Sequence, residues 1–416
     1  MNKTNIKKTP NENRPGYRKT KLGWLPEEWE VVRLEKITTI GNGTTPSKKE
    51  DRFWRNGSIP WLPTGKVNDA EICEADQFVT PQAVEETSLR LLPKDTVLIA
   101  MIGQGKTRGK AAITRIDATV NQNFAFIIAN NKLNSNYLFS KLTFDYLKLR
   151  GSARGGGQES LNCGIIKKYK IPLPPLPEQT RIADLLSSWD RAIATTEKLL
   201  AAQRLRKKGL MQQLLSGKKR LPGFSGEWEE VRLGNYLIKH NETTTENNQY
   251  PVLTSSRKGL FFQKDYYKKQ VASENNIGYN VVPRNYFTYR HMSDDLIFKF
   301  NINVLCDKGM VSTLYPVFRS NDIDQYYLLC LLNEGDAFKK YALQQKQGGS
   351  RTYMYFGKLE KLKINLPPLP EQTAIAKVLS AADAEITLLE ENLATLLVQK
   401  KGLMQQLLTG EKRLLS

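Results

Sequence analysis

Two segments of the chain, one near its middle and one at its end, carry apolar side chains at the alternating spacing of four and three residues that is typical of coiled coils. Each helix should begin at Pro177 or Pro370, where the missing N–H of proline costs no hydrogen bond, and should end near Gly217 or Gly410. The expected coiled-coil interface consists of Ile182, Leu186, Trp189, Ile193, Leu200, Leu210 and Leu214 in the first helix and Ile375, Leu379, Ile386, Leu389, Leu393, Leu396, Leu403 and Leu407 in the second.

The two helical segments are copies of one another. The sequence from Ile171 to Leu221 recurs without a gap from Ile364 to Leu414, and both copies contain PPLPEQ and KKGLMQQLL. A long helix with one apolar stripe needs a partner, and the other copy is the nearest one available. The first helix ends where the second half of the chain begins, and the second helix leaves that half. The pair should therefore be antiparallel and pseudo-twofold symmetric.

An alternative is that each helix packs separately against its own globular part. Thr196, Gln203 and Lys207 interrupt the first apolar stripe and favour this alternative. A weaker echo, GWLPEEWEVVRL ending at Leu34 and GFSGEWEEVRL ending at Leu233, opens each half of the chain. The helical repeat and this opening echo together predict two similar domains, each followed by a similar helical connector.

The remaining sequence predicts two heads of mixed α/β structure, so the fold class is α+β with two heads separated by two long antiparallel helices. Apolar runs predict strands at 96–102, 111–116, 124–129, 296–300 and 310–318, and amphipathic patterns predict helices at 135–149 and 324–341. The boundaries that follow are a flexible basic tail at 1–21, a first head at 22–176, a first spacer helix at 177–221, a second head at 222–369 and a second spacer helix at 370–416.

The charge of the chain points to a polyanionic partner. Lys and Arg number 62 against 42 Asp and Glu, which gives a formal net charge of +20. Nucleic acid is the first candidate and an anionic membrane surface the second. No apolar run is long enough to span a bilayer, and the N-terminus has no apolar core of a secretory signal. The four cysteines lie too far apart for a zinc motif or a disulfide framework, which favours a cytoplasmic location.

Glycine-rich basic stretches are the best candidates for DNA contact, because glycine allows close approach and the neighbouring side chains can donate to phosphates and base edges. The alternative for each residue is a solvated charge. In the first head the candidates are Gln104, Lys106, Thr107, Arg108, Lys110, Arg154 and Gln158, and in the second head they are Ser255, Ser256, Arg257, Lys258, Arg290, His291, Lys346, Gln347 and Arg351.

Motifs for catalysis are missing, so we expect no catalytic residue and no metal ligand. AMIGQGKT misses the phosphate-binding loop pattern because Ala100 stands where that pattern requires glycine. His240 and His291 are the only histidines, and no lysine follows an acidic residue by two positions, as metal-dependent nucleases of the acid–any–lysine type require. A nuclease that acts alone and a scaffold that binds proteins remain as alternatives.

The combination of two variable heads, two PPLPEQ-heptad segments and a basic chain resembles the specificity subunit of type I restriction–modification systems. The opening GYRKTKLGWLPEEWEVVRL and the second-head phrases GLFFQKDYYKK and MVSTLYPVF are similar to that family. The resemblance implies that each head is a target recognition domain for one half of a bipartite double-stranded DNA sequence. It also implies that the helices set the spacer between the halves.

The same resemblance implies the partners. Two methyltransferase (M) subunits, which bind S-adenosylmethionine, would dock on the helices, and two restriction (R) subunits would supply the endonuclease activity that depends on ATP and Mg²⁺. This chain would then bind no cofactor and would have no catalytic site of its own. The recognised bases and the spacer length stay open.

Overall fold

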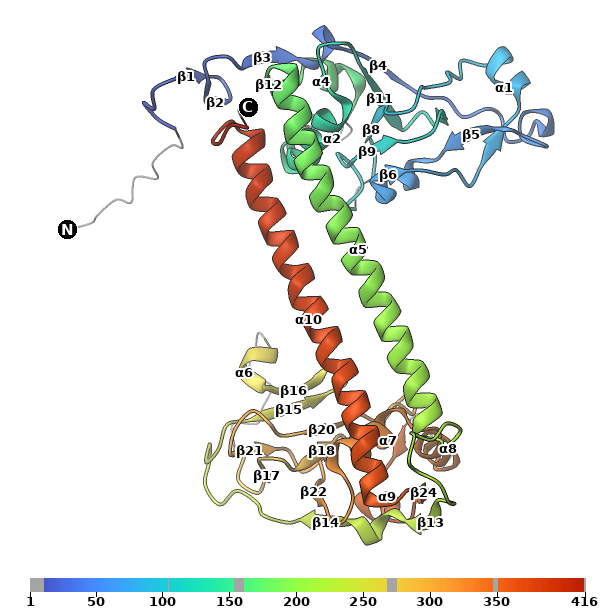
Figure 1. The fold of residues 1–416 in the computed structure, drawn as a ribbon, viewed down its shortest axis with the longest axis vertical. Helices are drawn as coiled ribbons and strands as arrows, with labels where there is room; N and C mark the ends of the chain where they lie inside the picture. Colours follow the sequence, from blue (N-terminus) through green and yellow to red (C-terminus); the bar gives the residue numbers. More distant parts are fainter. Residues whose placement is uncertain (1–10, 104, 153–160, 268–274, 347–350, 415–416) are drawn as a thin grey trace. The chain divides into compact units, whose positions relative to one another are not determined.

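The computed structural model describes residues 11–103, 105–152, 161–267, 275–346 and 351–414 (Figure 1). The chain divides into a first unit, Met1–Thr196 with Asn392–Ser416, and a second unit, Glu197–Glu391. Helix α5 (Leu176–Leu214) and helix α10 (Leu369–Leu408) each contribute one part to each unit. No helix among the described residues is long and apolar enough to cross a membrane.

The first unit is built on a five-stranded sheet with the order β4-β11-β8-β9-β6. Its strands are β4 (Thr38–Asn42), β11 (Phe124–Ala129), β8 (Val97–Ala100), β9 (Ala111–Thr114) and β6 (Glu71–Ile72). Smaller sheets combine β10 (Thr119–Val120), β5 (Ile59–Leu62) and β7 (Phe78–Val79), β1 (Tyr17–Thr20) and β2 (Gly23–Pro26), and β3 (Glu30–Arg33) and β12 (Lys170–Leu173). The short helices are α1 (Pro81–Glu86), α2 (Ser135–Phe144), α3 (Tyr146–Gly151) and α4 (Cys163–Lys168).

The second unit contains a four-stranded sheet with the order β14-β22-β18-β20. Its strands are β14 (Leu237–His240), β22 (Val317–Ser320), β18 (Phe287–Tyr289) and β20 (Phe300–Ile302). Paired strands are β13 (Glu229–Arg232) with β24 (Lys363–Leu366), β15 (Leu253–Ser256) with β16 (Gly259–Phe262), β17 (Asn280–Pro283) with β21 (Lys308–Val311), and β19 (Met292–Ser293) with β23 (Thr352–Tyr353). The short helices are α6 (Gln263–Tyr266), α7 (Gln325–Glu334), α8 (Asp336–Gln344) and α9 (Phe356–Leu359).

The predicted strands of the first head are confirmed, whereas the strands of the second head and the helices of both heads need correction. Strands β8, β9 and β11 lie inside the three predicted runs. The strand predicted at 296–300 is wrong except at Phe300, because Leu296 adopts a left-handed backbone with φ of 65°. The run at 310–318 contains the end of β21 and the start of β22, separated by a turn in which the Tyr315 N–H donates to the Ser312 carbonyl. Both predicted head helices are broken in two, at Asp145 and at Gly335.

Burial follows the predicted coiled-coil stripe along both helices. Every residue of the predicted interface is buried or half-buried, including both ends of each helix. The ends also join the cores of the heads: Ile182 and Leu407 lie in the core of the first unit, and Leu214 and Ile375 in that of the second. The helix ends therefore serve both purposes, pairing with each other and packing on a head.

Ion pairs show that the helices are antiparallel inside each unit. In the second unit Lys207 of α5 pairs with Asp383 of α10, and Arg204 pairs with Glu390 at 2.5 Å. In the first unit Lys400 of α10 pairs with Asp190 of α5. Lys207 and Lys400 are equivalent positions of the repeat, as are Asp190 and Asp383. The lysine that interrupts the apolar stripe thus has an acidic partner on the opposite helix, and such polar pairs fix the register of a coiled coil.

The repeated PPLPEQ segment joins each helix to its head. The buried Glu178 carboxylate accepts from the Trp29 indole at 3.0 Å and from Arg413 at 2.8 Å. In the second unit Glu371 accepts from the Trp228 indole at 3.3 Å and pairs with Arg220. The repeat therefore encodes the same joint twice, built from a helix start, a head and the segment after the opposite helix.

The glutamine that follows each buried glutamate of the PPLPEQ segment makes a second contact with the head. The Gln179 side chain accepts from the Asn134 N–H at 2.9 Å, and Gln372 accepts from the Asp324 N–H at 2.9 Å. Asn134 and Asp324 are the N-caps of α2 and α7, whose side chains accept from N–H groups of the first turn. The PPLPEQ motif therefore sets the position of the first head helix in each unit.

The predicted flexible tail at 1–21 is corrected for its described part. Residues 17–20 form β1, which pairs antiparallel with β2. Arg14 donates to the carbonyl of Glu411 at 3.1 Å, and the Arg18 guanidinium donates to the Trp29 carbonyl at 2.7 Å. Arg14 and Arg18, which the sequence places in a flexible tail, therefore fasten this segment to the first unit.

Candidate nucleic-acid interface

The basic loop between β8 and β9 is the described candidate surface of the first head. Gly103 and Gly109 have φ of 115° and 83°, a backbone that favours glycine. The Lys106 carbonyl accepts from the Tyr146 hydroxyl at 2.9 Å, which fastens the loop to α3. The Lys106 side chain is exposed, and the Lys110 ammonium donates to the Asn68 side chain at 2.7 Å. This turn thus presents Lys106 to solvent from a fixed backbone.

The other candidates in the first head are placed differently. Arg108 is only 7% exposed, so its side chain is buried and not presented at the surface. Thr107 is half-buried. Gln104, Arg154 and Gln158 lie outside the described residues. Of these predictions, Lys106 is the side chain that the structure places best for contact with a large anion.

Replacing Lys106 with alanine should weaken DNA binding by about the same factor for every sequence, because a lysine that contacts a phosphate carries no base information. The slope of log K against log salt should become shallower by about 0.9, which corresponds to one phosphate contact. A salt titration of DNA binding by the chain with Lys106→Ala measures this slope. An unchanged slope would remove Lys106 from the interface.

In the second unit the β15–β16 hairpin presents two basic side chains. Arg257 and Lys258 occupy its turn and are exposed. Ser255 is buried, where it donates to the Thr288 carbonyl and accepts from Asn301 at 2.8 Å. The Ser256 hydroxyl accepts from the Lys258 N–H at 3.1 Å and donates to the Gly259 carbonyl. The two serines thus hold the turn, whereas Arg257 and Lys258 face outward from it.

The candidate His291 directly precedes β19 and belongs to an aromatic cluster with Tyr353 and Tyr355. His291 is 8% exposed, and its ring lies 4.9 Å from that of Tyr355, which is 51% exposed. Tyr353 and Tyr355 stack with an interplanar angle of 12°. Burial lowers the pKa of His291, so its imidazole is neutral at pH 7. This histidine therefore supports the exposed Tyr355 ring and contributes no charge.

The last candidates of the second head lie at its surface where they are described. Arg290, Lys346 and Arg351 are exposed, and Gln347 lies outside the described residues. The sequence analysis missed Asp294 and Asp295, which follow β19 and contact Arg351 and Arg257. The only sign of these residues in the sequence is that the acidic pair in HMSDD follows a basic and aromatic stretch.

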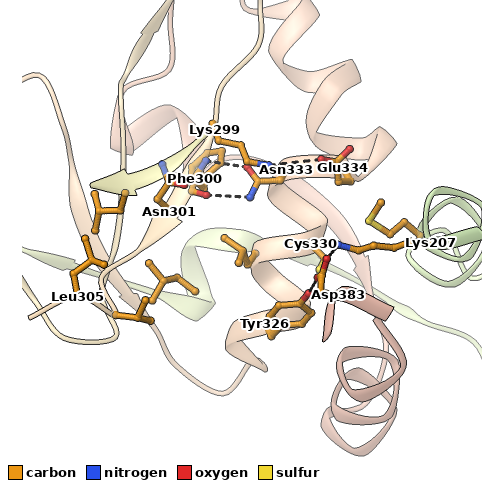
Figure 2. Close-up of a pocket in the computed structure, with 16 residues that line it drawn as sticks. Lys207, Lys299, Phe300, Asn301, Leu305, Tyr326, Cys330, Asn333, Glu334 and Asp383 are labelled. Carbon is orange, nitrogen blue, oxygen red and sulfur yellow. Dashed lines mark hydrogen bonds and ion pairs between the residues drawn. The ribbon is translucent and has the colours of Figure 1, made fainter. Parts of the chain in front are cut away.

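A pocket of about 480 Å³ opens in the second unit beside both long helices (Figure 2). At one end Lys207 and the Tyr326 hydroxyl both bind Asp383. Burial raises the pKa of the neighbouring Cys330 to about 11, so its thiol stays protonated and unreactive at neutral pH. Within the described ranges no group of three or more His, Cys, Asp or Glu could hold a metal.

Residues 26–202 and 226–397 each match the family described as the type I restriction modification DNA specificity domain. The chain belongs to this family. Each match spans one head and the first part of the helix that follows it. Each match begins within one of the two opening echoes and ends within one copy of the helical repeat.

Curated members of the family are similar over nearly the full chain. The specificity subunit of the type I restriction enzyme MjaIX from Methanocaldococcus jannaschii is 24% identical, and the similarity covers 95% of this chain and 96% of that protein. The putative MjaX specificity subunit from the same organism is 27% identical, with 95% and 96% covered.

Solved structures of the family share the fold. The S subunit from M. genitalium aligns with a TM-score of 0.57 at 13% identity and covers 91% of this chain and 96% of that one. The HsdS subunit from Thermoanaerobacter tengcongensis aligns with a TM-score of 0.50 at 17% identity, with 93% and 98% covered. The likeness at this identity concerns the fold, and it covers both heads and both long helices.

Proposed function

We propose that this chain is the DNA-specificity subunit of a type I restriction–modification enzyme and that each head recognises one half of a bipartite DNA target. The observation that carries the proposal is the tandem match to a DNA specificity domain on a chain with a net charge of +20. The exposed basic turns at Lys106 and at Arg257 and Lys258 support it. Two M subunits and two R subunits supply the S-adenosylmethionine, ATP and Mg²⁺ chemistry.

The division of labour follows from the physics of DNA recognition. Lysine and arginine contacts to phosphates give affinity that falls steeply with salt, and donors at base edges give sequence discrimination. Of two linked heads, one binds first. The second head then binds at a high effective concentration when the spacer matches the target. The paired helices, locked in register by Lys207 with Asp383 and Lys400 with Asp190, are suited to define that spacer.

A footprint of the methyltransferase complex tests the proposal. We expect two protected DNA segments separated by an unprotected gap, because each head covers one half of the target. Protein-binding heads, as in the scaffold alternative, would leave the DNA unprotected at both segments. The control is the same M subunit preparation without this chain, which should protect no specific site.

Incubation of the purified chain with DNA and Mg²⁺, with and without ATP, should produce no cut, because the proposal places the chemistry in the partner subunits. Cleavage that co-elutes with this chain through two orthogonal chromatography steps would favour the nuclease alternative. Complexes with M and R subunits under the same conditions serve as the positive control.

A further inference from the structure

Two consecutive aspartates at the end of β19 each hold an arginine from a different part of the second head. The Arg257 guanidinium donates through one terminal nitrogen to Asp295 Oδ1 at 2.5 Å. The Arg351 Nε–H donates to Asp294 Oδ1 at 2.9 Å. The aspartates are separated from their arginines by 38 and 57 residues in the sequence. One short acidic segment therefore orients two basic side chains that the chain supplies independently.

Local structure fixes this acidic segment. Ser293 faces Thr352 in the β19–β23 register, which brings Asp294 and Arg351 together at the end of the ladder. The Ser293 hydroxyl donates to Asp295 at 2.9 Å, and the Ile297 N–H donates to the same carboxylate at 3.3 Å. The Arg257 guanidinium and this hydroxyl lower the pKa of Asp295, which is therefore ionised at neutral pH.

The exposure of the two pairs argues against a purely structural role. The side chains of Arg257 and Asp295 are 57% and 47% exposed, and those of Arg351 and Asp294 are 51% and 67% exposed. Ion pairs with this much water access contribute little to stability. Their effect is to restrict arginines that would otherwise sample many rotamers, and this restriction lowers the entropy cost of binding.

The adjacent carboxylates also select what the arginines can bind. A phosphate would meet a negative charge beside each guanidinium, so these arginines are poorly suited to the DNA backbone. A base edge is neutral, and each guanidinium keeps further N–H donors in its planar fork. Guanine offers the matching pair of acceptors, O6 and N7, in the major groove. Lys258 and Arg290 are also exposed, and the described contacts give them no acidic partner, as suits phosphate contact.

We infer that Arg257 and Arg351 each recognise a guanine in the half-site of the second head, with Asp295 and Asp294 as their positioning residues. The inference rests on the proposed function and adds to it the base and the side chains that select it. Arg351 directly precedes β23, and Tyr353, the last residue of β23, stacks with Tyr355.

The test uses the complete methyltransferase complex and a library of DNA targets in which methylated adenines are sequenced. The half-site of the second head should contain two required guanines. R257A should lower the preference for guanine at one of these positions, and R351A at the other. Each loss should be about 5- to 150-fold, which corresponds to one lost bidentate contact. D295N should relax the same position as R257A to a smaller extent, and D294N the position of R351A. The half-site of the first head should stay unchanged, which shows that each variant assembles.

The matched control is K258A, one residue from Arg257. K258A should weaken binding to all DNA sequences alike and reduce the slope of log K against log salt by about 0.9. The base preference should stay the same at every position. A second half-site without guanine would overturn the inference, and so would arginine variants that behave like K258A. A wild-type complex that methylates without any sequence preference would instead overturn the proposed function. The two failures are therefore distinguishable.

Discussion

Replacing Glu371 with alanine is expected to lower the free energy of unfolding by about 3 kcal/mol, because removing one partner of a buried ion pair leaves the other uncompensated. The Glu371 side chain is fully buried and binds both Arg220 and the Trp228 indole. Arg220 keeps 24% of its side-chain surface in water, which holds the loss at the low end of the range for buried pairs. Denaturant titration of the full chain measures the change.

The repeat supplies a second copy of this experiment and a matched control. Glu178→Ala should cost a similar amount, since Glu178 is equally buried and binds Arg413 and Trp29. Glu385→Ala should cost less than about 0.5 kcal/mol, because its pair with Arg206 is long at 3.8 Å and more than half exposed on both sides. Equal losses from the buried and the exposed glutamates would show that the joint does not hold head and helix together.

Inserting one heptad into α5 alone, after Leu200, should abolish sequence-specific methylation. The insertion shifts Lys207 and Arg204 by two turns relative to the parts of α5 that precede Leu200, while α10 keeps its length. Inserting heptads after both Leu200 and Glu391 should restore methylation. In that double variant both helices are longer by the same length. Lys207 can therefore still pair with Asp383, and Lys400 with Asp190.

The restored enzyme should recognise both original half-sites with a longer gap between them, because the helices set the spacer in the proposed function. Sequencing of methylated adenines measures half-sites and gap together. The control carries the same seven residues in the loop after Gly217, outside both helices. Restored methylation with the original gap would contradict the role of the helices as the spacer.

The helices were predictable because their signal is local. A heptad stripe needs only the spacing of apolar residues, and its positions are the buried ones in the structure. The joints could not be predicted in the same way, because Glu178 binds side chains 149 and 235 positions away. By its place in the sequence, Glu178 is only an acidic residue in the first turn of a helix, where negative charge suits the helix dipole. Its burial and its arginine depend on the antiparallel pairing.

The sequence indicates candidate contact residues by their type but not by their orientation. Basic, glycine-rich stretches mark turns at Lys106 and Arg257, and both side chains face solvent. Arg108 belongs to the same stretch as Lys106 and is buried, which composition alone does not show. Asp294 and Asp295 lower the positive charge of their segment, so the segment does not stand out in the sequence as a basic patch. Their role became visible only with the β19–β23 register.

In the proposed function, two separate heads recognise two separate half-sites, and the shared segments are the same whatever the target. Exchange of residues 34–169 for those of another family member tests it most directly, since the exchange leaves β3, β12, Trp29 and Glu178 in place. Methylated adenines are then sequenced for the parent and the exchanged complex. The account predicts that one half-site changes while the other half-site and the gap stay the same. A change in both half-sites would contradict it.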